Sequence, residues 1–207
     1  MCGKRYLTIG IAVAAILWFY MFSPWTSGIT SFWLNMSSAA VALTVIAAIG
    51  NRNNKPGKTS FAGSVSLGVV IAFALWCVFW TGDKISQLLF DFARGQVDNV
   101  YGMKAGSSPV MIALLLLFVI GPAEEYFWRG FVQKNMSDLC GPTRAMIATT
   151  LIYALVHVWS FNFMLVMAAL VAGAVWGILY RLKPSLLPAL IVSHAVWDAL
   201  VFVILPI

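Results

Sequence analysis

The chain has 207 residues, of which 61% are hydrophobic and only 10% are charged. A soluble domain typically carries about 25% charged residues, so this composition excludes an ordinary soluble globule and predicts one transmembrane domain over residues 1–207. The net charge of +6 does not indicate nucleic-acid binding, because the basic residues stand in short loops rather than on one face. Three scattered cysteines, Cys2, Cys77 and Cys140, lack the spacing of a disulfide framework or a metal site.

Long uncharged runs predict three spans in the first 80 residues. Lys4 and Arg5 precede the first run, and no small-x-small cleavage site follows it, so we expect an uncleaved span rather than a signal peptide. The polar stretch at 51–60 is the clearest loop in the chain. The three spans are expected at residues 6–23, 29–49 and 61–80.

The one long connection, residues 81–108, has helical periodicity. Ile85, Leu88, Leu89 and Phe92 recur at i, i+3, i+4 and i+7 among charged residues. This spacing predicts an amphipathic helix on the bilayer surface or over the mouth of the bundle. Both a plain connector and a lid that gates the substrate fit this pattern.

The remaining residues, 109–207, predict a core of four helices. Its first span carries two glutamates, and the breaker Gly141-Pro142 separates it from the next. The fold class is therefore all-α: a polytopic membrane helix bundle of about seven transmembrane helices plus one amphipathic interfacial helix, placed in the cell membrane. The last three spans are expected at residues 143–161, 163–180 and 185–207.

Basic residues predict that the N-terminus is inside and the C-terminus outside. With this orientation the outer side holds only Lys84, Arg94 and Lys104. The inner side holds nine: Lys4, Arg5, Arg52, Lys55, Lys58, Lys134, Arg144, Arg181 and Lys183.

Few ionisable side chains stand inside the predicted spans. A charged residue at the centre of a membrane helix costs about 2.5–3.5 kcal/mol on insertion scales, so each one there indicates function by default. They include both glutamates and both histidines of the chain. The six residues are Glu124, Glu125, Arg129, His157, His194 and Asp198.

Helical geometry organises these residues. Glu124 is turned about 100° from Glu125, so the two carboxylates face different neighbours. We expect Glu124, His157 and His194, from three helices, to meet at one buried point. Three pairs at i, i+4 share a helix face, namely Glu125 with Arg129, Tyr153 with His157, and His194 with Asp198.

Three chemistries fit such a set. A carboxylate and an imidazole that share a water molecule can deprotonate it for attack on a carbonyl, while a second imidazole stabilises the oxyanion. The same donors, Glu124, His157 and His194, could instead hold Zn²⁺. They could also form the proton relay of a transporter.

The motifs resemble a known family. Glu124-Glu125-x-x-x-Arg129 matches EExxxR, Tyr153-x-x-x-His157 approximates FxxxH, and His194-x-x-x-Asp198 matches HxxxN with Asp at the last position. In this order, over residues 109–198, they resemble the CPBP family of CAAX prenyl-proteases and bacteriocin-processing proteins, which are glutamic-type intramembrane endopeptidases.

The resemblance implies a role for each residue. Glu124 would be the base that activates water, and His157 would hold that water. Glu125 and Arg129 would brace the site by pairing, and His194 with residue 198 would form the oxyanion site. No cofactor is implied, and zinc is the minority alternative. Because an ionised Asp198 cannot donate to an oxyanion, we expect it to accept from His194 or to be held protonated.

The expected function is hydrolysis of a peptide bond in a membrane-embedded or lipid-anchored peptide or protein, with no nucleic-acid partner. Prenylated, bacteriocin-like and C-terminally anchored substrates are all left open. The alternatives are a non-enzymatic membrane protein of the same fold, such as an immunity factor or scaffold, and a proton-coupled transporter.

Overall fold

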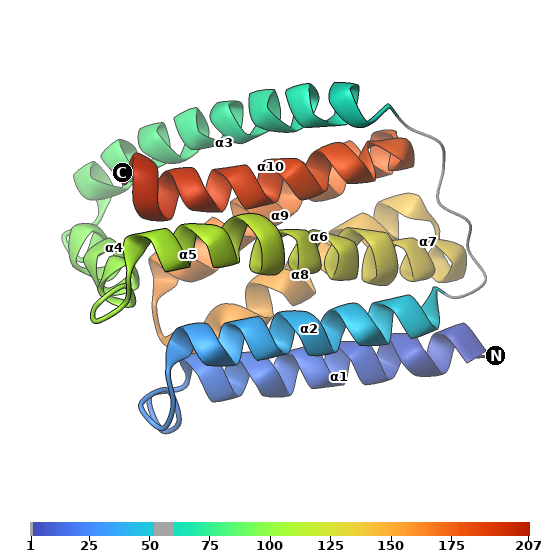
Figure 1. Cartoon of the computed structure of the whole chain (residues 1–207), viewed down its shortest axis with the longest axis horizontal. Helices are drawn as coiled ribbons and strands as arrows, with labels where there is room; N and C mark the ends of the chain where they lie inside the picture. The colour runs from blue at the N-terminus through green and yellow to red at the C-terminus, as the bar shows by residue number, and fades with distance from the viewer. Residues whose placement is uncertain (1, 52–59) are drawn as a thin grey trace.

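The computed structural model describes residues 2–51 and 60–207, and long helices dominate both segments (Figure 1). The helices run roughly parallel to one long axis, and the two termini lie at opposite ends of the bundle (Figure 1). The predicted all-α polytopic bundle is thus confirmed. Most of the loop predicted at 51–60, with Arg52, Lys55 and Lys58, lies outside the described residues.

The N-terminal part consists of three helices without an internal proline. Each is uncharged over most of its length, and its continuous α-helical hydrogen bonds satisfy the backbone groups within the helix, as a membrane requires. The Ser60 side chain caps the third by accepting from the Gly63 N–H. The helices are α1 (Cys2–Phe22), α2 (Phe32–Gly50) and α3 (Phe61–Leu89).

The third helix is longer than the sequence predicts. It continues past Trp80 to Leu89 and ends only where Phe90 turns to extended backbone. The predicted amphipathic helix was therefore wrong in its bounds, because its periodic residues from Ile85 to Leu89 extend α3. No proline stands there to stop it. The connection contains a separate helix, α4 (Ala93–Gly102).

The stretch that carries the glutamates is helical throughout, with two wider π-turns. Pro122 has no N–H to complete the α-helical ladder, and the π-turn η1 lies directly before it. Such π-turns are frequent at functional sites, and here they flank both glutamates. The segments are α5 (Pro109–Leu115), η1 (Leu116–Ile120), α6 (Gly121–Phe127), η2 (Trp128–Gln133) and α7 (Lys134–Cys140).

The last third of the chain forms three helices. Six helices among the described residues are long and apolar enough to cross a membrane, and α8, with 15 residues, falls short of that length. The predicted span at 143–161 instead ends in a 3-10 turn that begins at His157. The segments are α8 (Pro142–Val156), η3 (His157–Ser160), α9 (Phe163–Leu182), η4 (Pro184–Leu186), α10 (Leu187–Ala199) and η5 (Leu200–Ile204).

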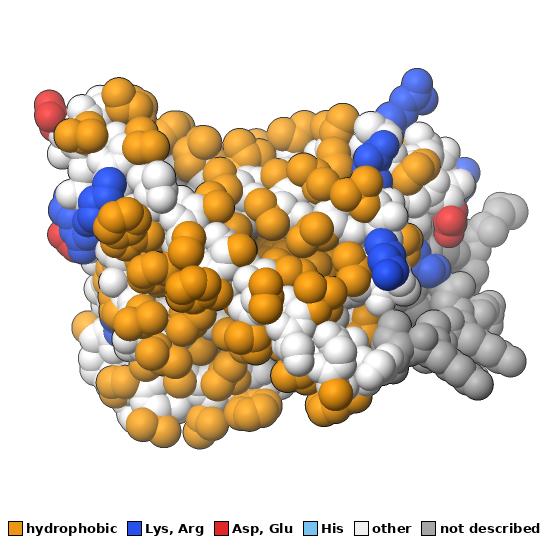
Figure 2. Space-filling model, turned by 90° about the horizontal axis from the view of Figure 1, so that it is seen from above, with side chains coloured by type: hydrophobic (Ala, Val, Ile, Leu, Met, Phe, Trp, Pro, Cys, Tyr) orange, Lys and Arg blue, Asp and Glu red, His pale blue; other side chains and the backbone are white. Residues whose placement is uncertain are grey.

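The surface has the pattern of a membrane protein. In Figure 2 hydrophobic side chains cover the middle of the visible face, and Lys, Arg and acidic side chains gather toward the two ends. Exposed Phe, Leu, Ile and Val side chains continue this apolar belt along the helices. The chain is a multi-pass membrane protein, and its N-in orientation stays a prediction.

A glycine lets α6 and α10 approach closely. A Cβ atom added at Gly121 would lie 2.6 Å from the Cα atom of Ala195 and 2.8 Å from its N atom. Real Cβ atoms do not come this near to backbone, so a larger residue would push the helices apart. Because His194 precedes Ala195, this contact sets the distance from His194 to the glutamates.

We predict that Gly121→Ala destabilises the fold by about 1–3 kcal/mol through overpacking. The thermal midpoint of the detergent-purified protein should fall accordingly. The control is Gly95→Ala in α4, where an added Cβ meets nothing within 4 Å and alanine favours the helix. Equal midpoints for the two variants would contradict the close approach.

Candidate active site

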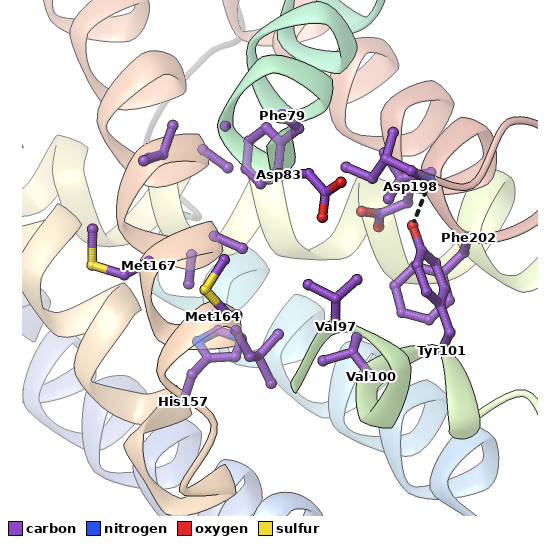
Figure 3. Close-up of a pocket in the computed structure, with 18 of the residues that line it drawn as sticks. Phe79, Asp83, Val97, Val100, Tyr101, His157, Met164, Met167, Asp198 and Phe202 are labelled. Atoms are coloured by element: carbon purple, nitrogen blue, oxygen red, sulfur yellow. Dashed lines mark hydrogen bonds between the residues drawn. The ribbon is translucent and has the colours of Figure 1, made fainter. Parts of the chain in front are cut away.

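Four of the six ionisable residues of the spans line one cavity of about 540 Å³, namely Glu124, His157, His194 and Asp198. Its walls are mostly apolar and come from α2, α3, α4 and α9. In Figure 3 His157 lies across the cavity from Asp198. The structure thus brings together the predicted residues of three helices. The polar lining consists mainly of Asp83, Glu124, Tyr153, His157, His194 and Asp198.

Glu124 in α6 faces the cavity while remaining 4% exposed. The Tyr153 hydroxyl in α8 donates to Glu124 Oε2 over 2.9 Å. The tyrosine that replaces the phenylalanine of the FxxxH motif therefore supplies a hydrogen-bond donor to this carboxylate. This bond orients the side chain and leaves Oε1 for another donor.

Glu125 points away from the cavity into a buried bridge. Its Oε1 accepts from Arg129 Nη1 over 2.7 Å, so the pair predicted at i, i+4 is present. The same oxygen lies 3.1 Å from His194 Nδ1. Arg129 Nη2 donates to the Gly173 carbonyl over 3.0 Å. One buried ion pair thus ties α6 and η2 to α9 and α10.

His194 is held from three sides. Glu125 binds its Nδ1, Trp176 stacks on the ring with 4.0 Å between centroids, and Asp198 Oδ2 lies 3.5 Å from its Nε2. The position of Asp198 agrees with a carboxylate that accepts from His194. Both residues line the cavity, so the Nε2 edge of the ring faces the space where a substrate would lie.

His157 has a partner on each ring nitrogen. Its Nδ1 lies 2.8 Å from the Tyr153 carbonyl oxygen, and its Nε2 accepts from Trp18 Nε1 over 3.0 Å. The ring is 6% exposed and lines the cavity. With both bonds made, neither nitrogen is available to water, so the predicted water-holding role requires one partner to leave.

The side chains that the zinc alternative requires, Glu124, His157 and His194, are not arranged as metal ligands. Within residues 2–51 and 60–207 no group of three His, Cys, Asp or Glu side chains is arranged to hold a metal ion. His157 Nε2, which would have to be a ligand, already accepts from an indole N–H.

Two residues at the site were missed by the sequence interpretation. Trp18 lies in α1, outside the motif-bearing region, and no pattern in the sequence signals its contact with His157. Asp83 was assigned to a surface helix, but it lies in α3 and its carboxylate turns into the cavity (Figure 3). A single acidic residue near the end of a long apolar run was the available signal.

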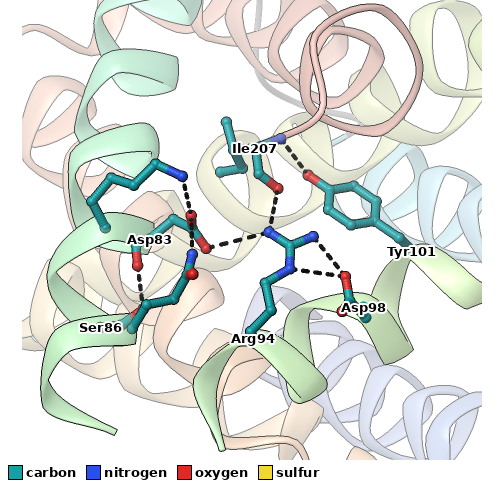
Figure 4. A network of polar contacts seen from close by, with 8 residues as sticks. Asp83, Ser86, Arg94, Asp98, Tyr101 and Ile207 are labelled. Carbon is teal, nitrogen blue, oxygen red and sulfur yellow. Dashed lines mark hydrogen bonds and ion pairs between the residues drawn. The ribbon is translucent and has the colours of Figure 1, made fainter. Parts of the chain in front are cut away.

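A polar network lies beside the cavity, and Asp83, Tyr101 and Ile207 belong to both (Figure 4). Arg94 donates to Asp98 over 2.6 Å and lies 4.0 Å from Asp83, and the Tyr101 hydroxyl accepts from the Ile207 N–H. The hydrogen bond from Arg94 to Asp98 raises the pKa of Arg94, so this cation stays charged. These contacts hold α4 across the ends of α3 and η5.

The comparison with known families matches the part of the chain that carries most of this site. Residues 106–200 match the family model described as type II CAAX prenyl endopeptidase Rce1-like. The chain is similar to the Rce1-like family over this segment. All six predicted site residues lie in the segment, whereas α1, α2 and α3 lie outside it. The Rce1-like assignment agrees with the resemblance to CAAX proteases and indicates a membrane protease. No curated protein and no solved structure matches the chain.

We predict that Arg129→Met lowers the free energy of unfolding by about 3–5 kcal/mol, because it leaves the buried Glu125 carboxylate without its counter-charge. The thermal midpoint in detergent would show the loss. Adding Glu125→Gln to the same protein should recover part of the stability. The exposed pair supplies the control, since Asp98→Asn should cost at most about 1 kcal/mol. Equal losses for Arg129→Met and Asp98→Asn would rule out a buried bridge.

Proposed function

We propose that this Rce1-like protein hydrolyses a peptide bond of a membrane-associated substrate with water activated by Glu124. The observation that supports this most is the convergence of a carboxylate and two imidazoles on one mostly apolar cavity. The reaction needs water and polar groups, and a membrane-associated substrate needs an apolar wall to bind. This cavity has polar groups on one part of its wall and hydrocarbon on the rest.

The proposed reaction uses each carboxylate differently. Glu124 Oε1 takes a proton from water, and the hydroxide adds to the scissile carbonyl carbon. His194 acts here in its doubly protonated form: its Nδ1–H is bonded to Glu125, and its Nε2–H donates to the oxyanion that forms. Collapse of this intermediate breaks the C–N bond, and Glu124 returns its proton to the leaving amine. Arg129 contacts no reacting atom and keeps Glu125 and His194 in place.

The substrate is proposed to be a peptide or protein that is embedded in the bilayer or anchored to it by a prenyl group. The family model that residues 106–200 match is described as a prenyl endopeptidase. Phe79, Met164 and Phe202 are among the side chains that give the cavity its apolar wall, which suits a branched hydrocarbon chain (Figure 3). Each buried CH₂ group contributes about 0.8 kcal/mol of binding, so a prenyl chain supplies much of the affinity.

Glu124→Gln should abolish cleavage of an internally quenched, prenylated CAAX peptide in proteoliposomes. The amide keeps the shape of the side chain and can still accept from Tyr153, but it cannot take a proton from water, so the rate should fall at least about 10²-fold. The matched control is Asp138→Asn, the same change at an exposed position of α7, which should keep the wild-type rate.

Cleavage that persists in Glu124→Gln would reject this base. If the wild-type protein fails to cleave any such peptide, a non-enzymatic membrane protein of the same fold becomes the better hypothesis. Proton-coupled flux into liposomes that depends on Glu124 would instead favour the transporter.

The same peptide without its prenyl group should be cleaved with a kcat/KM lowered at least about 100-fold, mainly through KM. The hydrocarbon chain binds equally well in the ground state and in the transition state, and its removal leaves the reacting groups unchanged, so KM rises while kcat stays nearly constant. Michaelis–Menten kinetics on the two peptides would measure this. Equal kcat/KM values would reject the prenyl group as a determinant and favour an unmodified membrane segment as substrate.

A further inference from the structure

The ring of His157 is held by a helix far away in the sequence. Trp18 in α1 is 1% exposed, and its indole N–H donates to His157 Nε2 over 3.0 Å. The Trp18 ring meets His157 edge-on, with 5.9 Å between ring centroids and an angle of 81°. One turn later Phe22 packs on the same imidazole at 5.5 Å. The helix α1 therefore contacts His157 with two aromatic side chains.

The two hydrogen bonds define how His157 carries its proton. A backbone carbonyl only accepts, so the bond to Tyr153 O requires a proton on Nδ1. An indole N–H only donates, so Nε2 must offer its lone pair to Trp18. Tyr153 alone is enough to select this tautomer. The distinct effect of Trp18 is to occupy the one lone pair with which His157 could bind water.

The hydrogen bond from Trp18 to His157 Nε2 is made at the wall of the cavity. His157 and Phe22 both line the cavity. Tyr153 connects His157 to Glu124, because its carbonyl oxygen accepts from His157 Nδ1 and its hydroxyl donates to the Glu124 carboxylate. A water molecule that donates one hydrogen to Glu124 Oε1 has a second O–H for His157 Nε2. The indole N–H approaches the same atom from the α1 side.

We propose that Trp18 is a positioning residue that occupies the water-binding nitrogen of His157 until the hydrolytic water replaces it. This rests on the hydrolysis proposed above. Since α1 lies outside the segment that matches the family, the proposal makes the N-terminal part of the chain a component of the proteolytic site. Exchange of one hydrogen bond for another keeps His157 neutral and oriented throughout.

The first test observes the imidazole directly. The chain has two histidines, so protein labelled with ¹⁵N-histidine gives ring-nitrogen resonances from two imidazoles. The variant His194→Gln shows which resonances belong to His157. In Trp18→Phe the Nε2 resonance of His157 should move, because its donor is lost, while Nδ1 stays bonded to Tyr153. An unchanged Nε2 resonance would overturn the proposal regardless of activity.

The second test measures kinetics on the prenylated CAAX peptide. Trp18→Phe should raise kcat about fivefold with KM unchanged, which corresponds to one net hydrogen bond of about 1 kcal/mol. The control is Trp128→Phe, which removes the same volume from the same aromatic cluster, although Trp128 Nε1 has no hydrogen-bond partner within the described residues. This variant should leave kcat unchanged or lower it.

A fall in kcat of equal size in both variants would show a packing role only and would overturn the proposal. If Trp18→Phe does not fold, benzothienylalanine at position 18 keeps the ring size and replaces the N–H with sulfur. A wild-type protein without peptidase activity would refute the proposed function. The ¹⁵N experiment would still decide whether the Trp18 indole N–H is bonded to His157 Nε2.

Discussion

The structure of the site depends on the pairing of Glu125 with Arg129. An ionised group without a partner costs several kcal/mol in a low-dielectric interior, so each of these two residues fixes the other. Their 2.7 Å contact is extended by the Gly173 carbonyl and by His194, which brings α9 and α10 to the helix that bears the glutamates. An interaction that is needed for charge balance thereby also sets the arrangement of the helices around the cavity.

The adjacent carboxylate follows from this constraint. With Glu125 committed to the bridge, the helical turn of about 100° directs Glu124 into the cavity, where it has a neutral donor in Tyr153 instead of a counter-charge. Two neighbouring residues of the same type thus differ in environment. One is balanced by a cation and buried behind the cavity wall, and the other lines the cavity.

The fold class and most of the predicted site geometry could be read from the sequence, because hydropathy and i, i+4 spacing are local signals. The pair of Glu125 with Arg129 is an example. The end of α3 could not be read, since the charged residues after Trp80 suggested a separate surface segment. Only the structure shows that the helix continues there and that Asp83 alone among residues 81–90 is buried, 4.0 Å from Arg94 of α4. The bond from Trp18 to His157 joins residues 139 positions apart, and no periodicity reports such a contact. The division into three N-terminal spans and a catalytic core stays a prediction.

The length of α3 has a consequence for the membrane around the protein. Its 29 residues extend roughly 43 Å, whereas the hydrocarbon layer is about 30 Å thick. Such a helix must tilt or extend into the headgroup region, and its last turns carry Asp83 at the cavity wall. A thinner or thicker bilayer changes that tilt, so acyl-chain length acts on the position of Asp83 in the cavity wall.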